Sequence, residues 1–207
     1  MANILITGGS RGIGAEAVRQ FAAAGHKVVF TYHKSEIEAD LLRQETGATP
    51  VRCDVKHHDS VKIAVDKAVS VLGQIDVLIC SAAIAGQGLI SDMDISKWEE
   101  VINTDLSGVF YCIRYILPAM ISRRSGCIIT VGPMCEETGA SAYSAAKAGV
   151  IGLTKALAEE TRLSGIRVNC ISAGDPAGAV RTMLFIASDD ASSVTGQVIG
   201  VSGGPVI

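Results

Sequence analysis

Aromatic residues and surplus basic charge are both scarce in this 207-residue sequence. Aromatics make up 4% of the chain and the formal net charge is −3. A nucleic-acid-binding surface needs a basic field, so this balance argues against nucleic acid as a partner. No apolar run approaches the roughly 20 residues of a transmembrane helix, and no signal-peptide pattern precedes the first apolar segment. We therefore expect no membrane association and a cytoplasmic location.

The six cysteines lack the spacing of a metal site. They lie far apart in the sequence, at positions 53, 80, 112, 127, 135 and 170. Structural zinc sites instead use pairs of ligands a few residues apart. Several of these cysteines lie inside apolar segments, which is typical of buried free thiols in a reducing compartment. We expect free thiols and no metal centre.

Glycine and small apolar residues are abundant and are arranged in alternating segments. Hydrophobic residues make up 48% of the chain, and there are 22 glycines. Expected strands cover residues 3–7, 27–32, 49–53, 75–80, 127–131, 167–171 and 197–201. Expected helices cover residues 15–24, 35–44, 59–72, 98–120, 142–162 and 176–187, the fourth with a break near its start. The alternation predicts one α/β domain over residues 1–207, a Rossmann-type doubly wound parallel sheet of about seven strands with helices on both faces.

A glycine-rich turn follows the first expected strand. Residues 8–14 read Gly-Gly-Ser-Arg-Gly-Ile-Gly and lead into the first expected helix. In this strand–turn–helix context, glycines let the backbone approach a pyrophosphate, which then lies at the positive end of the helix. The alternative is an ordinary tight turn. We expect a nucleotide-binding turn.

Tyr143 and Lys147 are four residues apart on an expected helix, so their side chains share one face. A neighbouring ammonium favours the phenolate and lowers the pKa of a tyrosine from its usual value of about 10. Such a tyrosine can give a proton to a carbonyl oxygen or take one from an alcohol. The alternative for the pair alone is a solvated lysine beside a half-buried tyrosine.

The ordered set of motifs resembles the short-chain dehydrogenase/reductase family, in particular its 3-oxoacyl-[acyl-carrier-protein] reductase-like members. The resemblance covers nearly the whole chain. It rests on the glycine turn and on five further segments: Cys53-Asp54-Val55, 102–108 with Asn103, Tyr143-x-x-x-Lys147, 166–169, and 195–197 before Gly203-Gly204.

The resemblance implies roles for individual residues. Tyr143 is the expected general acid/base, and Lys147 the residue that tunes it and holds the nicotinamide ribose. Asn103 is expected to hold a water that links Lys147 to solvent, unless it bonds its own backbone at a helix start. Asp54 is expected to meet the adenine, unless it merely forms a turn. The implied cofactor site comprises Gly8, Ser10, Arg11, Gly12, Ile13, Gly14, His33, Lys34, Asp54, Val55, Ser81, Ala82, Ala83, Tyr143 and Lys147.

Charge at the end of the second expected strand favours NADP(H) over NAD(H). An acid there would bind the ribose hydroxyls of NAD and repel a 2′-phosphate. The segment instead reads Thr31-Tyr32-His33-Lys34 with no acid before Glu36, and Arg11 lies in the glycine turn. Cations here suit a 2′-phosphate, although they can also be ordinary solvated residues. We expect an NADP(H)-dependent oxidoreductase that moves a hydride between nicotinamide and a ketone or secondary alcohol.

The resemblance further implies a 3-oxoacyl thioester substrate, free or on a carrier protein, and a homodimer or homotetramer. Apolar residues on more than one face of the expected helices 98–120 and 142–162 also favour a subunit contact, with a thick core as the alternative. A catalytically impaired nucleotide-binding homologue, acting as a scaffold or sensor, is the alternative function.

Four departures from the family pattern affect the active site. Cys80-Ser81-Ala82-Ala83 stands where the family has Asn-Asn-Ala-Gly, and Pro133 stands where it has a serine that bonds the substrate carbonyl. Ser141 would need a different loop path to replace that serine, and the loop before Tyr143 is about three residues short. After the sixth expected strand, residues 171–174 run directly into 175–180, with no substrate-binding lid. Either the protein lacks this lid, or the printed sequence omits residues that the protein contains.

Overall fold

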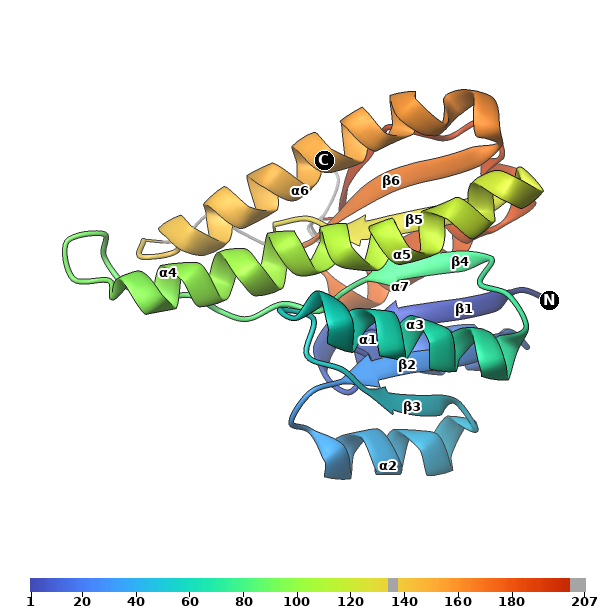
Figure 1. Cartoon of the computed structure of the whole chain (residues 1–207), viewed down its shortest axis with the longest axis horizontal. Coiled ribbons are helices and arrows are strands. Elements are labelled where there is room, and N and C mark those ends of the chain that lie inside the picture. The colour runs from blue at the N-terminus through green and yellow to red at the C-terminus, as the bar shows by residue number, and fades with distance from the viewer. Residues whose placement is uncertain (134–137, 202–207) are drawn as a thin grey trace.

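A seven-stranded parallel sheet forms the centre of the computed structural model, which describes residues 1–133 and 138–201 (Figure 1). The strands are β1 (Asn3–Thr7), β2 (Lys27–Tyr32), β3 (Thr49–Arg52), β4 (Val77–Cys80), β5 (Gly126–Val131), β6 (Ile166–Ala173) and β7 (Val198–Val201). Their order is β3-β2-β1-β4-β5-β6-β7, and every pairing is parallel. The predicted doubly wound fold is confirmed. The strand order reverses between β1 and β4, and a crevice for ligands opens there at the carboxyl ends of the strands.

The helices are α1 (Gly12–Ala23), α2 (Glu36–Thr46), α3 (His58–Leu72), α4 (Ile95–Ile102), α5 (Gly108–Arg123), α6 (Ser141–Thr161) and α7 (Pro176–Ala187). Most begin and end within a few residues of the expected positions. The helix expected at 98–120 begins earlier and is divided by a π-helical turn, Asn103–Ser107. In this turn the N–H of Gly108 bonds the carbonyl of Asn103, five residues back. One extra residue is therefore accommodated between α4 and α5.

Side chains of alternating direction cover both faces of the sheet. Ile4 and Ile6 of β1 pack in the cluster under α1, α2 and α7, whereas Leu5 packs on the opposite face under α3, α5 and α6. Ile6 is paired with Phe30 on one side and Ile79 on the other, so the middle of the sheet is apolar throughout. Burial on both faces explains why the strands read as continuous apolar runs.

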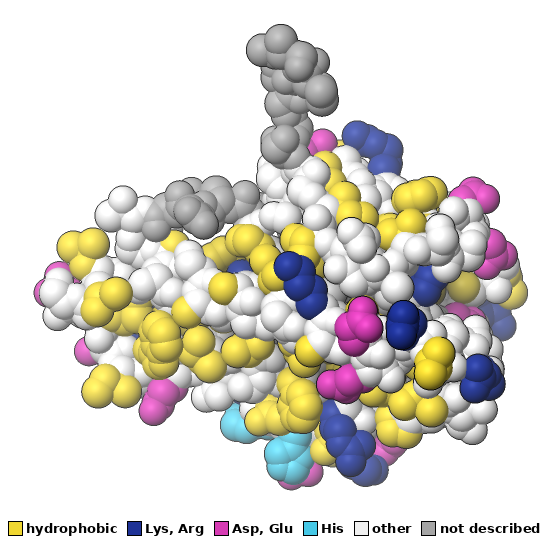
Figure 2. Space-filling model, turned by 90° about the horizontal axis from the view of Figure 1, so that it is seen from above, with side chains coloured by type: hydrophobic (Ala, Val, Ile, Leu, Met, Phe, Trp, Pro, Cys, Tyr) yellow, Lys and Arg dark blue, Asp and Glu magenta, His cyan; other side chains and the backbone are white. Residues whose placement is uncertain are grey.

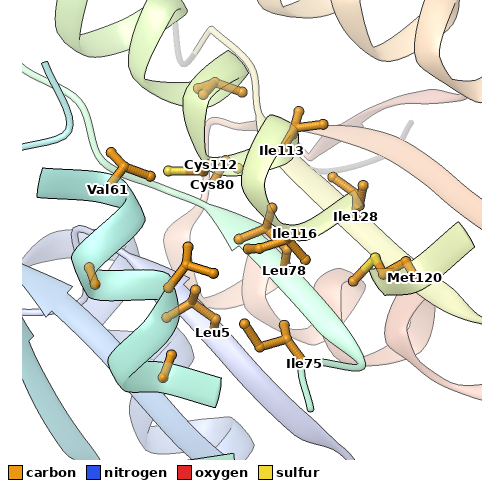
Figure 3. Packing of buried hydrophobic residues seen from close by; sticks show 14 of the residues in the cluster. Leu5, Val61, Ile75, Leu78, Cys80, Cys112, Ile113, Ile116, Met120 and Ile128 are labelled. Atoms are coloured by element: carbon orange, nitrogen blue, oxygen red, sulfur yellow. The ribbon is translucent and has the colours of Figure 1, made fainter. Parts of the chain in front are cut away.

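The α3/α5 face shows how tightly this core is filled (Figure 3). Leu78 and Ile128 of the sheet meet Val61 of α3 and Ile116 of α5, all with less than 4% of their surface exposed. Each such aliphatic side chain contributes about 1.5–3 kcal/mol to folding. The five cysteines among the described residues are buried free thiols, as expected; Cys135 lies outside the described residues.

The connection between β6 and α7 consists of two residues, Gly174 and Asp175. Their N–H groups both bond the carbonyl of Val201 at the end of β7. The Asp175 carboxylate accepts from the N–H groups of Ala177 (3.1 Å) and Gly178 (3.0 Å), in the first turn of α7. The chain thus passes directly from strand to capped helix, with no intervening lid.

None of the described helices is both long enough and apolar enough to cross a membrane.

Asp175→Ala should lower the free energy of unfolding by about 0.5–2 kcal/mol, because two N–H groups at the start of α7 lose their acceptor. Urea unfolding followed by circular dichroism measures this loss. Asp40→Ala on the exposed face of α2 is the matched control, and should change stability by less than about 0.5 kcal/mol. Equal losses in the two variants would contradict the assigned cap.

Candidate active site

A groove of ≈ 510 Å³ lies at the carboxyl ends of β1, β2, β3 and β4. It is lined by most of the residues expected to hold a cofactor: Gly8, Ser10, Arg11, Gly12, Ile13, His33, Lys34, Asp54, Val55, Ser81, Ala82 and Ala83. The lining also includes residues that the sequence did not indicate: Thr31, Tyr32, Ser35, Cys53, Lys56, Ile84, Glu100 and Thr104. The sheet topology thus brings five separate chain segments to one cavity.

Gly8 and Gly14 of the glycine turn pack so closely against other backbone that neither position has room for a side chain. A Cβ on Gly14 would lie 2.3 Å from the Gly8 carbonyl oxygen, and a Cβ on Gly8 would lie 2.6 Å from the Cα of Ala82. Gly8 also has a positive φ of 66°, a conformation that favours glycine. Gly14 is buried under the turn rather than lining the groove. The turn and the segment after β4 are therefore mutually fitted.

Threonine hydroxyls hold the backbone on both sides of this contact, in the glycine turn and in the segment after β4. The Thr31 Oγ1 accepts from the N–H of Gly8, and the Thr7 Oγ1 accepts from the N–H groups of Ser81 and Ala82, each at 3.2 Å. At the start of α1 no side chain caps the helix. Its first N–H groups, at the positive end of the helix, are suited to a phosphate.

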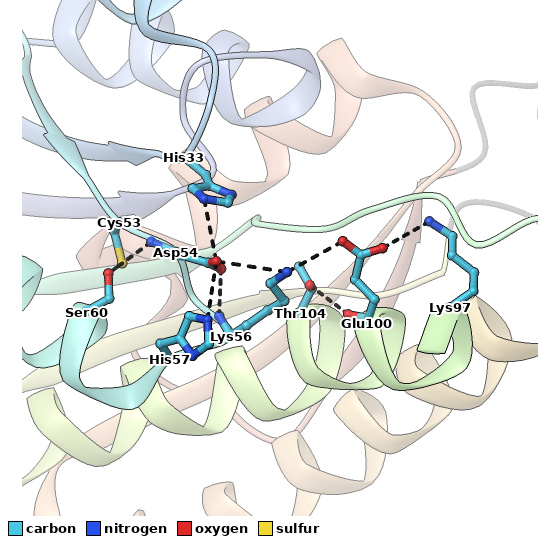
Figure 4. A network of polar contacts seen from close by, with 9 residues as sticks. All are labelled: His33, Cys53, Asp54, Lys56, His57, Ser60, Lys97, Glu100 and Thr104. Carbon is cyan, nitrogen blue, oxygen red and sulfur yellow. Dashed lines mark hydrogen bonds and ion pairs between the residues drawn. The ribbon is translucent and has the colours of Figure 1, made fainter. Parts of the chain in front are cut away.

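Charged side chains surround the β2 and β3 side of the groove (Figure 4). The Asp54 Oδ2 lies 3.5 Å from the His33 Nε2, 3.7 Å from the His57 Nε2 and 3.9 Å from the Lys56 Nζ. The Lys56 Nζ also lies 3.5 Å from the Glu100 Oε1. Asp54 Oδ1 accepts from the N–H of Lys56 at 3.1 Å, so Asp54 also forms the turn that its type suggested.

Lys147 is buried, with 1% of its surface exposed, and neither it nor Tyr143 is among the residues that line the groove. Its Nζ donates to the carbonyl of Val131 at the end of β5 (3.0 Å) and lies 5.6 Å from the centre of the Tyr143 ring. The expected shared face on α6 is therefore present. Ala142 and Ala146 lie on the same stretch of α6 and pack with Val101 in a small apolar cluster that Tyr143 adjoins.

Asp105 of the π turn also faces Lys147. It is fully buried, and its Oδ2 lies 3.9 Å from the Lys147 Nζ. Its Oδ1 accepts from the N–H of Ile84 at 2.9 Å, while its Oδ2 has no hydrogen-bond partner among the described residues. Burial raises the pKa of Asp105 to about 6, against the opposing effect of Lys147. Burial likewise lowers the pKa of Lys147, against the opposing effect of Asp105.

Asn103 does not have the position expected of it. It is exposed at the start of the π turn, and Asp105 two residues later is the side chain directed at Lys147. Residues two apart in a helical turn point in nearly opposite directions, so only one of the two can face α6. The correction is therefore from Asn103 to Asp105. The signal in the sequence was that Asp105 is the one charged residue between Val101 and Ile113.

The position of the expected serine offers no hydroxyl. Pro133 follows β5, and its carbonyl accepts from the Ser172 hydroxyl. The Ser141 Oγ at the start of α6 is buried and has no hydrogen-bond partner within the described part of the chain. The intervening residues 134–137 lie outside the described residues. The substrate-side hydroxyl is thus absent at the expected place.

Comparison with known proteins finds one matching family and several reductases of similar sequence or structure. Residues 2–187 match the family described as short chain dehydrogenase. A 3-oxoacyl-[acyl-carrier-protein] reductase of Staphylococcus epidermidis is 35% identical over 97% of both chains. An acetoacetyl-CoA reductase of Rhizobium meliloti is 33% identical over 97% of this chain and 96% of its own. A variant of the actinorhodin polyketide ketoreductase, crystallised with NADPH, has a TM-score of 0.91 at 25% identity and covers 98% of this chain and 97% of that one.

These relatives contain segments that this chain lacks. The alignment with the S. epidermidis enzyme is 237 positions long, whereas the chain has 207 residues, so at least 30 positions are gaps in this chain. The two-residue link between β6 and α7 occupies the place where the resemblance leads us to expect a lid. The family match spans most of the chain and agrees with the strand order, the glycine turn and the Tyr143–Lys147 pair. The chain belongs to the short chain dehydrogenase family, and is an oxidoreductase.

Proposed function

We propose that the protein is an NADP(H)-dependent reductase of ketones, with 3-oxoacyl thioesters as its substrate class. The observation that carries this proposal is the buried Lys147 beside Tyr143, next to a groove fitted to a dinucleotide. Its Nζ adjoins the Tyr143 ring, and Asp105 connects it to Ile84 in the groove wall. A proton donor and a nucleotide site thus meet at the carboxyl ends of β4 and β5.

The groove suits a dinucleotide in shape and charge. The glycine turn has no room for side chains at Gly8 and Gly14, and the uncapped start of α1 that follows it can face a diphosphate. Arg11 and Lys34 line the groove near the end of β2, whereas the nearest following acid, Glu36, is not among its lining residues. These cations support NADP(H), as does the NADPH in the structure of the related polyketide ketoreductase. When bound, the nicotinamide supplies or accepts the hydride.

The proton would be transferred by a residue of the chain itself. Tyr143 would donate its phenolic proton to the carbonyl oxygen of the substrate, or accept one from an alcohol in the reverse direction. Lys147, held by Val131, would orient the ribose and stabilise charge at Tyr143. Pro133 supplies no hydroxyl for the substrate oxygen, a loss that typically costs on the order of 10²–10³ in rate. We therefore expect a slower enzyme than its relatives.

The substrate class comes from the relatives that act on 3-oxoacyl-[acyl-carrier-protein] and acetoacetyl-CoA. Both names describe thioesters with a ketone two carbons away, either on a carrier protein or on a small molecule. We propose that this protein has no lid, since β6 leads directly into the capped start of α7. An open mouth suits a substrate carried on a larger partner.

We propose a homo-oligomer built on the exposed apolar surface of α4 and α5. Hydrophobic side chains gather on the left half of Figure 2, on the side where α4 lies in Figure 1. The exposed large apolar residues of these two helices are Ile95 and Trp98 of α4, and Phe110 and Ile121 of α5. Exposed patches of this kind commonly mark protein contacts.

We also propose a cytoplasmic location for the protein. The buried free thiols support it, because free thiols persist in a reducing compartment.

A nucleotide-binding scaffold or sensor without turnover is the second candidate. Pro133 and the direct β6–α7 connection favour it, because both remove parts that would hold a substrate. The retained Tyr143 and Lys147 oppose it.

Wild-type protein should oxidise NADPH in the presence of an acetoacetyl thioester, and Tyr143→Phe should reduce kcat by about 10²-fold or more, since the proton donor is lost. Absorbance at 340 nm measures turnover, and fluorescence of bound NADPH shows that the variant still binds. Tyr115→Phe, whose hydroxyl lies 3.1 Å from the His58 Nδ1 outside the site, is the matched control and should retain activity. Folded, NADPH-bound wild type that reduces no ketone would support the scaffold.

Arg11→Ala and Lys34→Ala should each weaken NADP(H) binding about tenfold and leave NAD(H) binding nearly unchanged, because each removes a cation from the 2′-phosphate side. Thermal shift with either cofactor measures the difference. Lys27→Ala, at the opposite end of β2, removes an exposed cation away from the groove and should change neither. Tighter binding of NAD(H) by the wild type would refute the assignment.

A further inference from the structure

The carboxyl group of Asp105, buried 3.9 Å from the Lys147 Nζ, has no part in the proton transfer assigned to Tyr143 and Lys147. We propose that Asp105 is a positioning residue whose carboxylate neutralises the Lys147 ammonium and thereby keeps Tyr143 in its protonated, proton-donating form. The site then favours reduction of a carbonyl over oxidation of an alcohol. This inference rests on the proposed function and deepens it by assigning the preferred direction of proton transfer.

Several ionisable groups face the pair from the surrounding elements α4, α6, β4 and β6: Lys97, Tyr143, Cys80 and Cys170. Lys97 has its own partner, since its Nζ lies 3.4 Å from the Glu100 Oε2. Burial raises the pKa of Cys80 to about 12 and also raises that of Cys170, so both thiols are neutral near pH 7. Among the described residues, Asp105 is therefore the carboxyl group that faces Lys147.

One ammonium in a buried site is best balanced by one anion. The Asp105 carboxyl group and the Tyr143 phenol can each supply that anion. A second anion would be buried without a cation of its own, which is costly in a medium of low polarity. Carboxyl groups are far stronger acids than phenols, and Asp105, even with its pKa raised to about 6, ionises first. At neutral pH, Asp105 thus carries the negative charge and Tyr143 keeps its proton.

Asp105→Asn separates this electrostatic role from a structural one. An asparagine retains an oxygen that can accept from the N–H of Ile84, the one hydrogen bond that Asp105 makes among the described residues. It replaces the charged oxygen that faces Lys147 with a neutral amide nitrogen. With the carboxylate gone, the Tyr143 phenolate becomes the anion available to balance the ammonium. The phenolate should then form at lower pH.

The test is an ultraviolet titration of tyrosinate in the cofactor-free protein, with the Tyr143→Phe titration subtracted in each background. We expect the Tyr143 signal of the wild type to have its midpoint at or above about pH 10. In Asp105→Asn the midpoint should fall by at least about one pH unit. The pH dependence of alcohol oxidation, where turnover is measurable, should move in the same direction while the KM for the cofactor stays unchanged.

Asn103 supplies a matched control in the same turn. Asn103→Asp adds a carboxylate at an exposed position and should leave the midpoint unchanged. The double variant Asn103→Asp/Asp105→Asn has the net charge of the wild type and should behave like Asp105→Asn. Equal midpoints in the wild type and a folded Asp105→Asn would overturn the proposal.

The wild-type titration remains a test if Asp105→Asn does not fold, because a Tyr143 midpoint below about pH 8 would show that Asp105 does not hold Tyr143 protonated. Absence of turnover in every folded variant would instead defeat the proposed function. The titration midpoints, which need no turnover, would still report whether Asp105 controls the protonation of Tyr143.

Discussion

The ammonium of Lys147 lies out of contact with water, and the arrangement around it results from that fact. A buried cation must be compensated by oxygen atoms at close range. One comes from the carbonyl of Val131 at the end of β5, and another from the carboxylate of Asp105. The end of a strand, an interrupted helix and the face of α6 are therefore held together by one side chain. Asp105 in turn bonds the N–H of Ile84, which extends this arrangement to the wall of the groove.

The shape of the nucleotide groove depends on a different constraint: two positions in the glycine turn have no space for a side chain. Gly8 and Gly14 lie so close to neighbouring backbone that no other residue fits without movement. The hydroxyls of Thr7 and Thr31 bond the backbone on either side of this contact. The groove is thus shaped by backbone packing, while its charge comes from longer side chains at the rim. Shape and charge can consequently change independently in this fold.

Much of the architecture can be predicted from the sequence, because buried parallel strands must be apolar on both faces and therefore read as short continuous runs. The glycine turn was identified from its place between an expected strand and an expected helix, and the segment around Asp54 from the resemblance to the family. The contacts of Lys56 and Glu100 were not, since they join the segment after β3 to α4 through tertiary proximity alone. Asp105 was missed in favour of Asn103 because an apolar pattern does not reveal one extra residue in a helix. Local patterns thus predicted the fold, whereas the partners within the site required the three-dimensional arrangement.

The π-helical turn between α4 and α5 has a consequence for how this region can vary. Each residue added to a helix rotates the next part of the helix by about 100°. The wide turn at Asn103–Ser107 absorbs one residue, so deleting that residue would leave α4 and α5 aligned much as they are now and would change only the turn itself. The exposed side chains Ile95 and Trp98 of α4 would keep their direction, whereas Asp105 inside the turn would shift relative to Lys147. The turn therefore separates the chemistry inside the protein from the surface it offers to other molecules, because the residue beside Lys147 can change while the outer face of α4 stays in place.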